Sequence, residues 1–275
     1  MRAMERLYDG YLKGSLKAKI IFDARQLDYS ALDGEVSCDW TNLYPGAKEE
    51  VDKVNDPIPL GKGITILAFV DAAHARDEVT RRSVMGIMIF LNCTPVRWYT
   101  KRQATTVESS TYGSELVAAR ILATEMVMEM RLNLQSMGIP VRGASYMFGD
   151  NMSVITNTTL PSSCLKKKHN AIVGYHRIWE AIAAGIIKFI HVPGSRNIAD
   201  VLTKPLGPQV HGRLVKQLLN GKPPVVPAQG EYQNGEDCEQ CDATVTGTDP
   251  GTTEMMSVEN GVVCHGDRVG VNSPL

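Results

Sequence analysis

Four acidic residues stand where secondary-structure elements are expected to begin or end. Asp71 closes an apolar, β-branched run, and Asp150 closes a shorter run further along, whereas Glu115 and Asp200 open two expected helices. If the two strands are neighbours, their acids lie side by side and the helix-opening acids point back at them. Four carboxylates in one cleft repel one another, so the cleft needs shared cations. Oxygen-only ligation favours Mg²⁺ or Mn²⁺ over zinc.

The chemistry that such a cleft predicts is phosphodiester hydrolysis. Two ions about 3.5–4 Å apart can hold an attacking water and a leaving oxygen in line across the scissile bond. This gives hydrolysis of a nucleic acid without a protein nucleophile. Each acid alone also fits an ordinary role, as a turn residue, a helix-dipole partner, a cap or a first-turn acid. The prediction therefore depends on the joint placement of all four acids.

The elements that must position these acids follow from the apolar periodicity between residues 64 and 219. Apolar and β-branched runs predict three consecutive strands, which suggest an antiparallel meander, and helical spacing then predicts a long helix. Strands and helices alternate after it, so the order predicts an α/β fold with a mixed sheet. The expected strands cover 64–71, 84–91, 95–100, 146–150 and 186–192, and the expected helices cover 110–137, 169–184, 198–204 and 208–219.

Length and composition limit the other classes of protein. A chain of 275 residues that is 43% hydrophobic can bury a core, which excludes a collagen-like, coiled-coil or wholly disordered protein. It contains no apolar run of the roughly 20 residues that cross a bilayer, and its start lacks the apolar stretch of a signal peptide. We therefore expect an intracellular protein without a membrane partner. Its six scattered cysteines are interpreted as reduced thiols.

The net charge of −1 conceals two unlike parts. Residues 222–275 carry nine acidic and two basic side chains, a net charge of −7, whereas residues 1–221 carry a net charge of +6. The tail is rich in Pro, Gly and Thr and lacks apolar periodicity, so we expect it to be disordered. Its Cys238, Cys241, Cys264 and His265 could ligate zinc, although the adjacent Cys-His pair disfavours this interpretation.

A series of short motifs follows in order from about Tyr11 to Leu206: YLKG, FVDAAHA, TRRS, WYTKRQ, SSTYGSELVA, GDN, KKKHNA, YHRI, AAGII and NIADVLTKPL. In order and spacing this series resembles one family, the RNase H region of copia-type retrotransposon Pol polyproteins. The resemblance implies an RNase H-like fold, with a five-stranded mixed sheet whose strands 1–3 are antiparallel and whose later strands are parallel, flanked by helices. It also implies a ribonuclease that cuts the RNA strand of RNA/DNA hybrids with two Mg²⁺ or Mn²⁺ ions. Asp71, Glu115, Asp150 and Asp200 match its catalytic, metal-binding acids.

The resemblance also implies a domain organisation and partners. Residues 1–63 are interpreted as a remnant that follows a reverse transcriptase and connector, 64–206 as the RNase H-like domain, 207–221 as a C-terminal helix and 222–275 as the acidic tail. The chain thus resembles a C-terminal fragment of a polyprotein. Its expected partners are an RNA/DNA hybrid and the reverse transcriptase portion of the same polyprotein. Its expected location is the cytoplasm, in virus-like particles, or the nucleus.

A hybrid of A-like geometry presents sugars and phosphates in a shallow minor groove. The residues that bind it should therefore have basic, hydroxyl or amide side chains. Runs of basic residues often lie only on solvated faces of a protein. The net charge of +6 on residues 1–221 nevertheless favours a polyanion as the binding partner. Helix capping explains the polar candidates equally well. The candidate nucleic-acid-binding residues are Arg81, Arg82, Lys101, Arg102, Ser110, Asn151, Lys166, Lys167, Lys168 and His169.

Three departures from the family pattern keep other interpretations open. Ala73 stands where a second acid is usual, Arg76 replaces a glycine, and extra residues occur near 104–106 and 173–174. The second insertion lies within the helix expected over 169–184 and could break its register. The alternatives are a non-catalytic nucleic-acid-binding remnant of a degenerate retroelement and a structural remnant without activity.

Overall fold

The computed structural model describes residues 17–25, 29, 32, 38–50, 56–103, 108–163 and 172–219. All of them belong to a compact unit that spans Met1–Tyr232; a second unit, Gln233–Leu275, lies outside the described residues. The predictions for the acidic tail and its cysteines therefore stay predictions. The same holds for the basic run Lys166 to His169.

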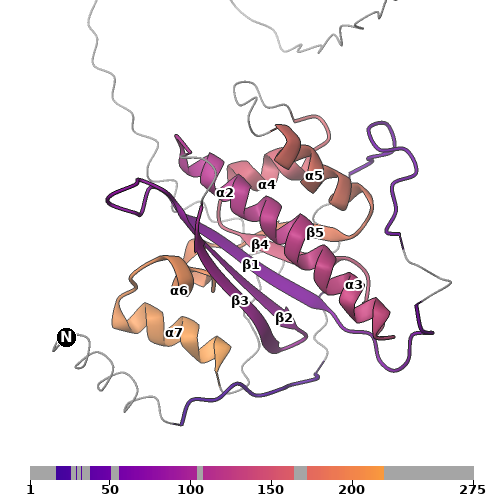
Figure 1. The fold of residues 1–275 in the computed structure, drawn as a ribbon, viewed down its shortest axis with the longest axis horizontal. Helices are drawn as coiled ribbons and strands as arrows, with labels where there is room; N and C mark the ends of the chain where they lie inside the picture. The colour runs from indigo at the N-terminus through magenta and orange to yellow at the C-terminus, as the bar shows by residue number, and fades with distance from the viewer. Residues whose placement is uncertain are drawn as a thin grey trace, which may run out of the picture. The chain divides into compact units, whose positions relative to one another are not determined.

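The core of the unit is a five-stranded sheet in the order β3-β2-β1-β4-β5 (Figure 1). β1 (Ile66–Ala73) pairs antiparallel with β2 (Val84–Leu91), which pairs antiparallel with β3 (Thr94–Arg102). On its other side β1 pairs in parallel with β4 (Ser145–Gly149), and β4 pairs in parallel with β5 (Ile187–His191). The predicted fold class, with three antiparallel strands followed by parallel ones, is confirmed.

One long helical run covers a face of this sheet. It consists of α2 (Thr111–Arg120), a π-helical segment (Ile121–Val127) and α3 (Met128–Ser136). It ends before Gly138, whose φ of +71° suits glycine. The single helix predicted over 110–137 thus has the right extent, but it contains a stretch of wider π turns. The hydroxyl of Thr124 donates to the carbonyl of Arg120 at the start of this stretch.

Two further helices pack beside α2. α4 (Met152–Thr159) contacts α2 and β5, and α5 (Ile172–Ala183) contacts α2 and the π-helical segment. α4 was not predicted, because its residues, MSVITNTT, are mostly β-branched or polar and favour helices weakly. The extra residue near Gly174 does not interrupt α5, which is continuous over the described part of the predicted helix. An added Cβ at Gly174 would lie 2.9 Å from the side chain of Arg120, so glycine allows this close approach.

The opposite face of the sheet is covered by α6 (Asp200–Thr203) and α7 (Pro208–Leu218). Successive side chains of β1 pack on opposite faces of the sheet, as expected for a strand that is buried on both faces. Val70 belongs to the cluster with Leu122 of the long helical run, whereas Phe69 belongs to the cluster that includes Ala199 and contacts Leu218. Among the described residues, no helix has the length and apolarity needed to cross a membrane.

Residues 38–50, here called the strap, pack on the domain although they precede it. Trp40 is 9% exposed and meets Trp179 of α5 edge-on, with ring centroids 5.1 Å apart. At the other end of the strap, both carboxylate oxygens of Glu49 accept hydrogen bonds of 2.6 Å from the guanidinium of Arg131 on α3. The strap therefore joins α5 to α3.

Candidate active site

The strand arrangement brings Asp71 and Asp150 to the same end of the sheet. Asp150 directly follows β4, the parallel neighbour of β1. Asp71 was expected to end its strand, but β1 continues to Ala73, because the pairing with β2 extends to Val84. The residues before and after Asp71 are therefore both paired with β2, and the side chain of Asp71 is almost fully buried.

Three carboxylates converge at this place. One oxygen each of Asp71, Asp150 and Asp200 lies within 4.8 Å of the other two, a spacing that could hold a metal ion. Asp200 is the first residue of α6, as predicted, and α6 packs on β1 and β2. Residues 50 to 130 positions apart in the chain thus form one cluster of oxygen ligands, the kind that hard divalent cations prefer.

Glu115 stands beside this cluster. It is the fifth residue of α2, further inside the helix than expected, and it is 9% exposed. Its Oε1 accepts a hydrogen bond of 3.1 Å from the backbone amide of Ala72 in β1. Burial, followed by the charges of Asp71 and Asp150, raises the pKa of Glu115 well above its ordinary value. Glu115 is therefore influenced by the charges of Asp71 and Asp150 without belonging to the closest group of carboxylates.

The other acids respond to the same crowding. Burial raises the pKa of Asp150, and the charge of Asp71 raises it further. Burial also raises the pKa of Asp200 to about 6, although the hydrogen bond from Lys204 opposes this shift. Several carboxylates in a poorly solvated cleft resist full ionisation unless positive charge is supplied.

Lys204, for which no role was predicted, supplies such a charge. Its Nζ lies 2.9 Å from Oδ1 of Asp200, 3.1 Å from Oδ1 of Asp71 and 3.8 Å from Oδ2 of Asp150. Burial alone would lower the pKa of the Lys204 ammonium, but the charge of Asp71 and the contacts with Asp200 raise it overall. The available signal was the spacing of four residues from Asp200, which brings the two side chains together over one turn.

Two neighbours fix Asp71 and α6 to one another. The hydroxyl of Thr203 donates a hydrogen bond to Oδ2 of Asp71. Gly86 is the β2 partner of Asp71, and an added Cβ there would lie 2.7 Å from Cγ2 of Thr203 and 3.0 Å from the carbonyl oxygen of Ala199. Glycine at this position thus lets α6 approach β2 closely enough to bring Asp200 to Asp71.

The donor set fits a divalent cation. Oδ1 of Asp71 is buried and accepts no hydrogen bond from the described part of the chain; its close cationic neighbour there is Lys204. A buried carboxylate oxygen is costly unless a cation faces it, and here that place can be taken by the ammonium of Lys204 or by a divalent ion. The three aspartates offer oxygen ligands alone, which suits Mg²⁺ or Mn²⁺ better than zinc.

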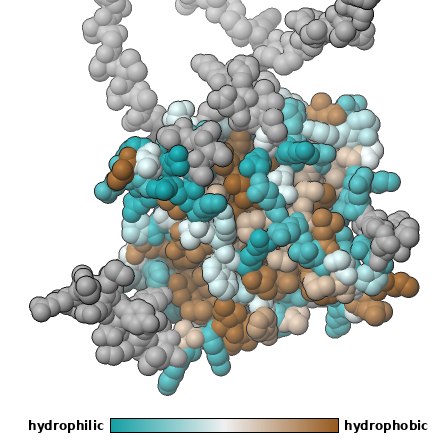
Figure 2. Space-filling view, in the orientation of Figure 1, coloured by the Kyte–Doolittle hydropathy of each residue, from teal (hydrophilic) through white to brown (hydrophobic). Residues whose placement is uncertain are grey.

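Four of the residues predicted to bind nucleic acid lie at the same end of the sheet as the carboxylates. Arg81 and Arg82 belong to the β1–β2 loop, and Lys101 and Arg102 end β3, whose Arg102 pairs with Val84 of β2. Figure 2 shows mostly hydrophilic residues around this loop, at the upper left. Nη1 of Arg102 lies 2.6 Å from Oδ2 of Asp77, so its charge is partly compensated within the protein.

Two polar candidates act as helix caps. Oγ of Ser110 accepts a hydrogen bond from the amide of Gly113 at the start of α2, and Oδ1 of Asn151 accepts one from the amide of Val154 at the start of α4. Capping accounts for both residue types. The structure does not describe Lys166, Lys167, Lys168 and His169, so their predicted contacts lie outside the described residues.

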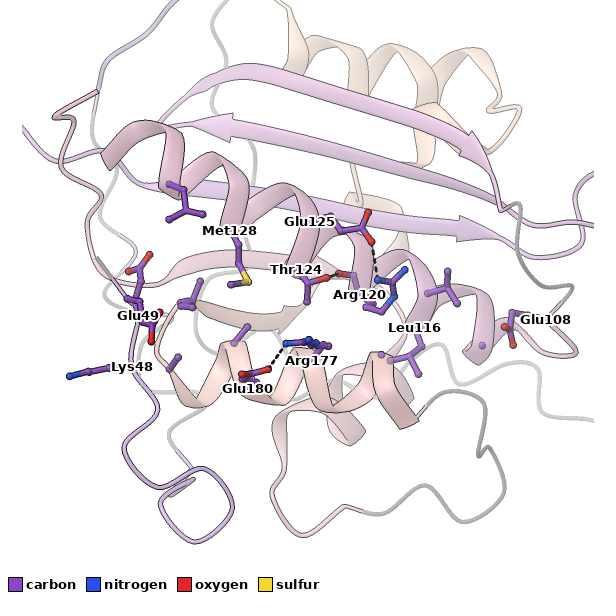
Figure 3. A pocket seen from close by; sticks show the side chains of 18 of the residues that line it. Lys48, Glu49, Glu108, Leu116, Arg120, Thr124, Glu125, Met128, Arg177 and Glu180 are labelled. Atoms are coloured by element: carbon purple, nitrogen blue, oxygen red, sulfur yellow. Dashed lines mark hydrogen bonds and ion pairs between the residues drawn. The ribbon is translucent and has the colours of Figure 1, made fainter. Parts of the chain in front are cut away.

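A large pocket lies elsewhere, between the long helical run and α5. Its volume is about 1130 Å³, and Figure 3 shows the ion pairs Arg120–Glu125 and Arg177–Glu180 inside it. Lys48 and Glu49 of the strap line one end. None of the four acids predicted to be catalytic lines this pocket, so it is separate from the carboxylate cluster.

The fold defines a class of protein. The strand order and the strand directions are those of an RNase H-like fold. This is the fold that the motif order implied.

Comparison with known proteins agrees with this class. The chain is similar to the retrovirus-related Pol polyproteins from transposon RE1 and transposon RE2 of Arabidopsis thaliana, with 30% and 29% identity over 146 residues. The match covers 53% of this chain and 10% of each relative, so the chain spans about a tenth of the length of the curated relatives it matches. The resemblance to copia-type Pol polyproteins is confirmed. No family model matches the chain.

Solved structures similar to the chain include RNase H1 from the halophilic archaeon Halobacterium salinarum, with 15% identity and a TM-score of 0.38 over 50% of this chain and 94% of that chain. Another is LC11-RNase H1 in complex with an RNA/DNA hybrid, with 12% identity and a TM-score of 0.37 over 50% of this chain and 94% of that chain. The assignment of the fold rests on the strand order and directions given above.

Proposed function

We propose that this chain is a ribonuclease H that hydrolyses the RNA strand of RNA/DNA hybrids within a retrotransposon reverse-transcription system. The observation that carries the proposal is the convergence of Asp71, Asp150 and Asp200 within 4.8 Å at one end of the sheet. Carboxylates gathered in this way are costly unless they hold cations. The proposed partners are the hybrid and the reverse transcriptase portion of the same polyprotein.

The proposed cofactor is a pair of Mg²⁺ or Mn²⁺ ions held by Asp71, Glu115, Asp150 and Asp200. When bound, such ions activate a water molecule and stabilise the leaving oxygen of a phosphodiester. The chain's own residues contribute rigidity. Thr203 fixes one oxygen of Asp71, and the amide of Ala72 fixes Oε1 of Glu115. Ligands held in this way need little reorganisation when cations arrive.

The substrate class follows from the basic residues at the same end of the sheet. Arg81, Arg82, Lys101 and Arg102 could contact phosphates of a duplex whose scissile bond lies at the carboxylates. Contacts of this kind read the sugar and phosphate backbone and ignore base identity. Affinity for the hybrid should therefore fall steeply as salt is added. In a plot of the logarithm of the binding constant against the logarithm of the salt concentration, each phosphate contact should contribute a slope of about −1.

The deciding experiment incubates the full chain with a hybrid labelled on its RNA strand and Mg²⁺. The wild type should cut the RNA strand, and EDTA should abolish cutting. Asp71→Asn should reduce cutting by about a hundredfold or more, because it removes one charged ligand while keeping the shape of the side chain. Asp39→Asn, at an exposed position of the strap, is the matched control and should cut like the wild type.

Two outcomes would overturn the proposal. If the wild type and Asp71→Asn leave the hybrid equally uncut, the nuclease proposal is lost. Retained, salt-dependent binding of the hybrid would then favour the non-catalytic nucleic-acid-binding remnant. Equal cutting by both proteins would instead assign the activity to a contaminant or to other residues.

A further inference from the structure

The ammonium of Lys204 lies at the centre of the candidate metal site. It contacts Asp71, Asp150 and Asp200 at 2.9–3.8 Å, and these three are also the residues whose oxygens could hold an ion. A divalent ion bound by these oxygens would compete with Nζ for the same carboxylates. The ammonium of Lys204 and a divalent ion therefore cannot both contact these carboxylates at short range.

The backbone places Lys204 so that it can both enter and leave this position. Lys204 follows the last residue of α6, and its amide donates to the carbonyl of Asp200. This tether keeps the side chain next to the cluster. At the same time the side chain is 38% exposed, whereas that of Asp71 is 1% exposed. The lysine thus has a path to solvent, and the buried aspartate does not.

The charge balance favours replacement of the lysine. One ammonium faces three close carboxylates, so it cannot neutralise all three of them. A divalent ion supplies twice the charge of the ammonium at a similar distance. The uncompensated carboxylates therefore attract a divalent ion even while Lys204 is present.

We propose that Lys204 is a tethered counter-cation of this site. It stabilises the carboxylate cluster before a divalent ion binds, and it leaves the cluster when the ion binds. Lys204 accordingly weakens the affinity for the ion and stabilises the ion-free domain. This inference rests on the proposed function, because it takes the cluster to be a metal site.

Lys204→Met tests the inference without any nuclease assay, since methionine keeps the length of the side chain and removes the charge. Titration with Mn²⁺ or Mg²⁺ alone, followed by calorimetry, should show binding about tenfold tighter than in the wild type. The ion-free variant should melt about 4 °C lower, because the carboxylates lose their counter-charge. This difference should shrink when Mg²⁺ saturates the site.

Two control variants separate this effect from net charge and from misfolding. Lys216→Met removes the same charge from an exposed position on α7 and should bind the ion like the wild type. Lys204→Arg keeps the charge on a larger group, so it should bind the ion no more tightly than the wild type. If Lys204→Met fails to fold without metal, folding that is rescued by Mn²⁺ also supports the inference.

The outcomes distinguish this inference from the proposed function. If the wild type binds the ion and Lys204→Met binds it equally or more weakly, the counter-cation role is overturned and the metal site stands. If Lys204→Met binds the ion and the wild type shows no heat, the role is supported in its strongest form. Absence of binding in both proteins overturns the metal site and this inference together.

Discussion

The side-chain amide of Asn197 donates a hydrogen bond of 2.9 Å to the backbone carbonyl of Val70, 127 residues earlier in the chain. Its amide oxygen accepts a second bond, of 3.1 Å, from the backbone amide of Ala199. Asn197 is completely buried. One side chain therefore joins the strand that carries Asp71 to the turn that leads into α6 and Asp200.

Asn197→Ala should destabilise the domain and loosen the site. It leaves the carbonyl of Val70 buried without this partner, which costs about 1–3 kcal/mol. Urea denaturation should show that decrease in the free energy of unfolding, and the affinity for Mn²⁺ should fall because Asp200 is less firmly placed. Asn133→Ala, at an exposed position on α3, should change stability by no more than about 0.5 kcal/mol. Equal stability of the two variants would contradict the role of Asn197.

Gly86→Ala should push α6 away from the sheet. The added Cβ would meet the Cβ of Leu202 at 2.9 Å and Cγ2 of Thr203 at 2.7 Å, closer than side chains pack. Overpacking of this kind costs about 1–3 kcal/mol, and here it also separates Asp200 from Asp71. The thermal midpoint and the affinity for Mn²⁺ should both fall.

Gly212→Ala is the matched control for this overpacking. Gly212 lies within α7, and nothing lies within 4 Å of its added Cβ. Alanine favours a helix over glycine, so this variant should gain about 0.5–1 kcal/mol in stability. A Gly86→Ala protein that melts like the wild type and binds Mn²⁺ equally well would show that the close approach of α6 is dispensable.

Much of the fold was predictable from local pattern. β1 and β2 are continuous apolar runs buried on both faces, and the long helical run shows regular apolar spacing, so each element's type was clear. α4 was missed because its threonines and β-branched residues favour helix weakly, although capping had been considered for Asn151, its N-cap. The π-helical segment has no local signature and depends on tertiary packing.

The acids of the candidate site could be predicted from the sequence, but the residues that surround them could not. Asp71, Asp150 and Asp200 stand next to recognisable strands and a short motif, whose order suggested their convergence. The position of Lys204 depends on where α6 packs, and this is decided by contacts such as that of Thr203 with Asp71, 132 residues away. Spacing along the chain can indicate the contact of Lys204 with Asp200, but it contains no information on contacts between distant residues such as Thr203 and Asp71.

Arg131→Met should detach the strap from α3. Arg131 is 4% exposed and donates to Glu49, to the carbonyl of Gly143 and to Oγ of Ser145. Its removal leaves these acceptors without their partner, which should cost about 3 kcal/mol. A double-mutant cycle with Glu49→Gln should show coupling between the two side chains in urea denaturation.

The exposed ion pair of Arg97 and Glu129 provides the comparison. Nη1 of Arg97 lies 2.7 Å from Oε2 of Glu129, yet both side chains are more than a third exposed. Exposed pairs contribute at most about 1 kcal/mol, so Arg97→Met should have a small effect. If Arg131→Met is no more damaging than Arg97→Met, the strap does not depend on its buried guanidinium.

Truncation after Gly221 should strengthen binding of an RNA/DNA hybrid, because it removes residues 222–275 and their net charge of −7 from a chain whose remainder carries +6. The dissociation constant should fall severalfold at about 0.05 M salt, and the difference should vanish near 1 M, where the Debye length is about 3 Å. A full-length variant with the nine tail acids changed to amides should bind like the truncated chain. If the truncated chain alone binds more tightly, the tail acts by its bulk; if neither does, the tail has no influence on the hybrid-binding surface.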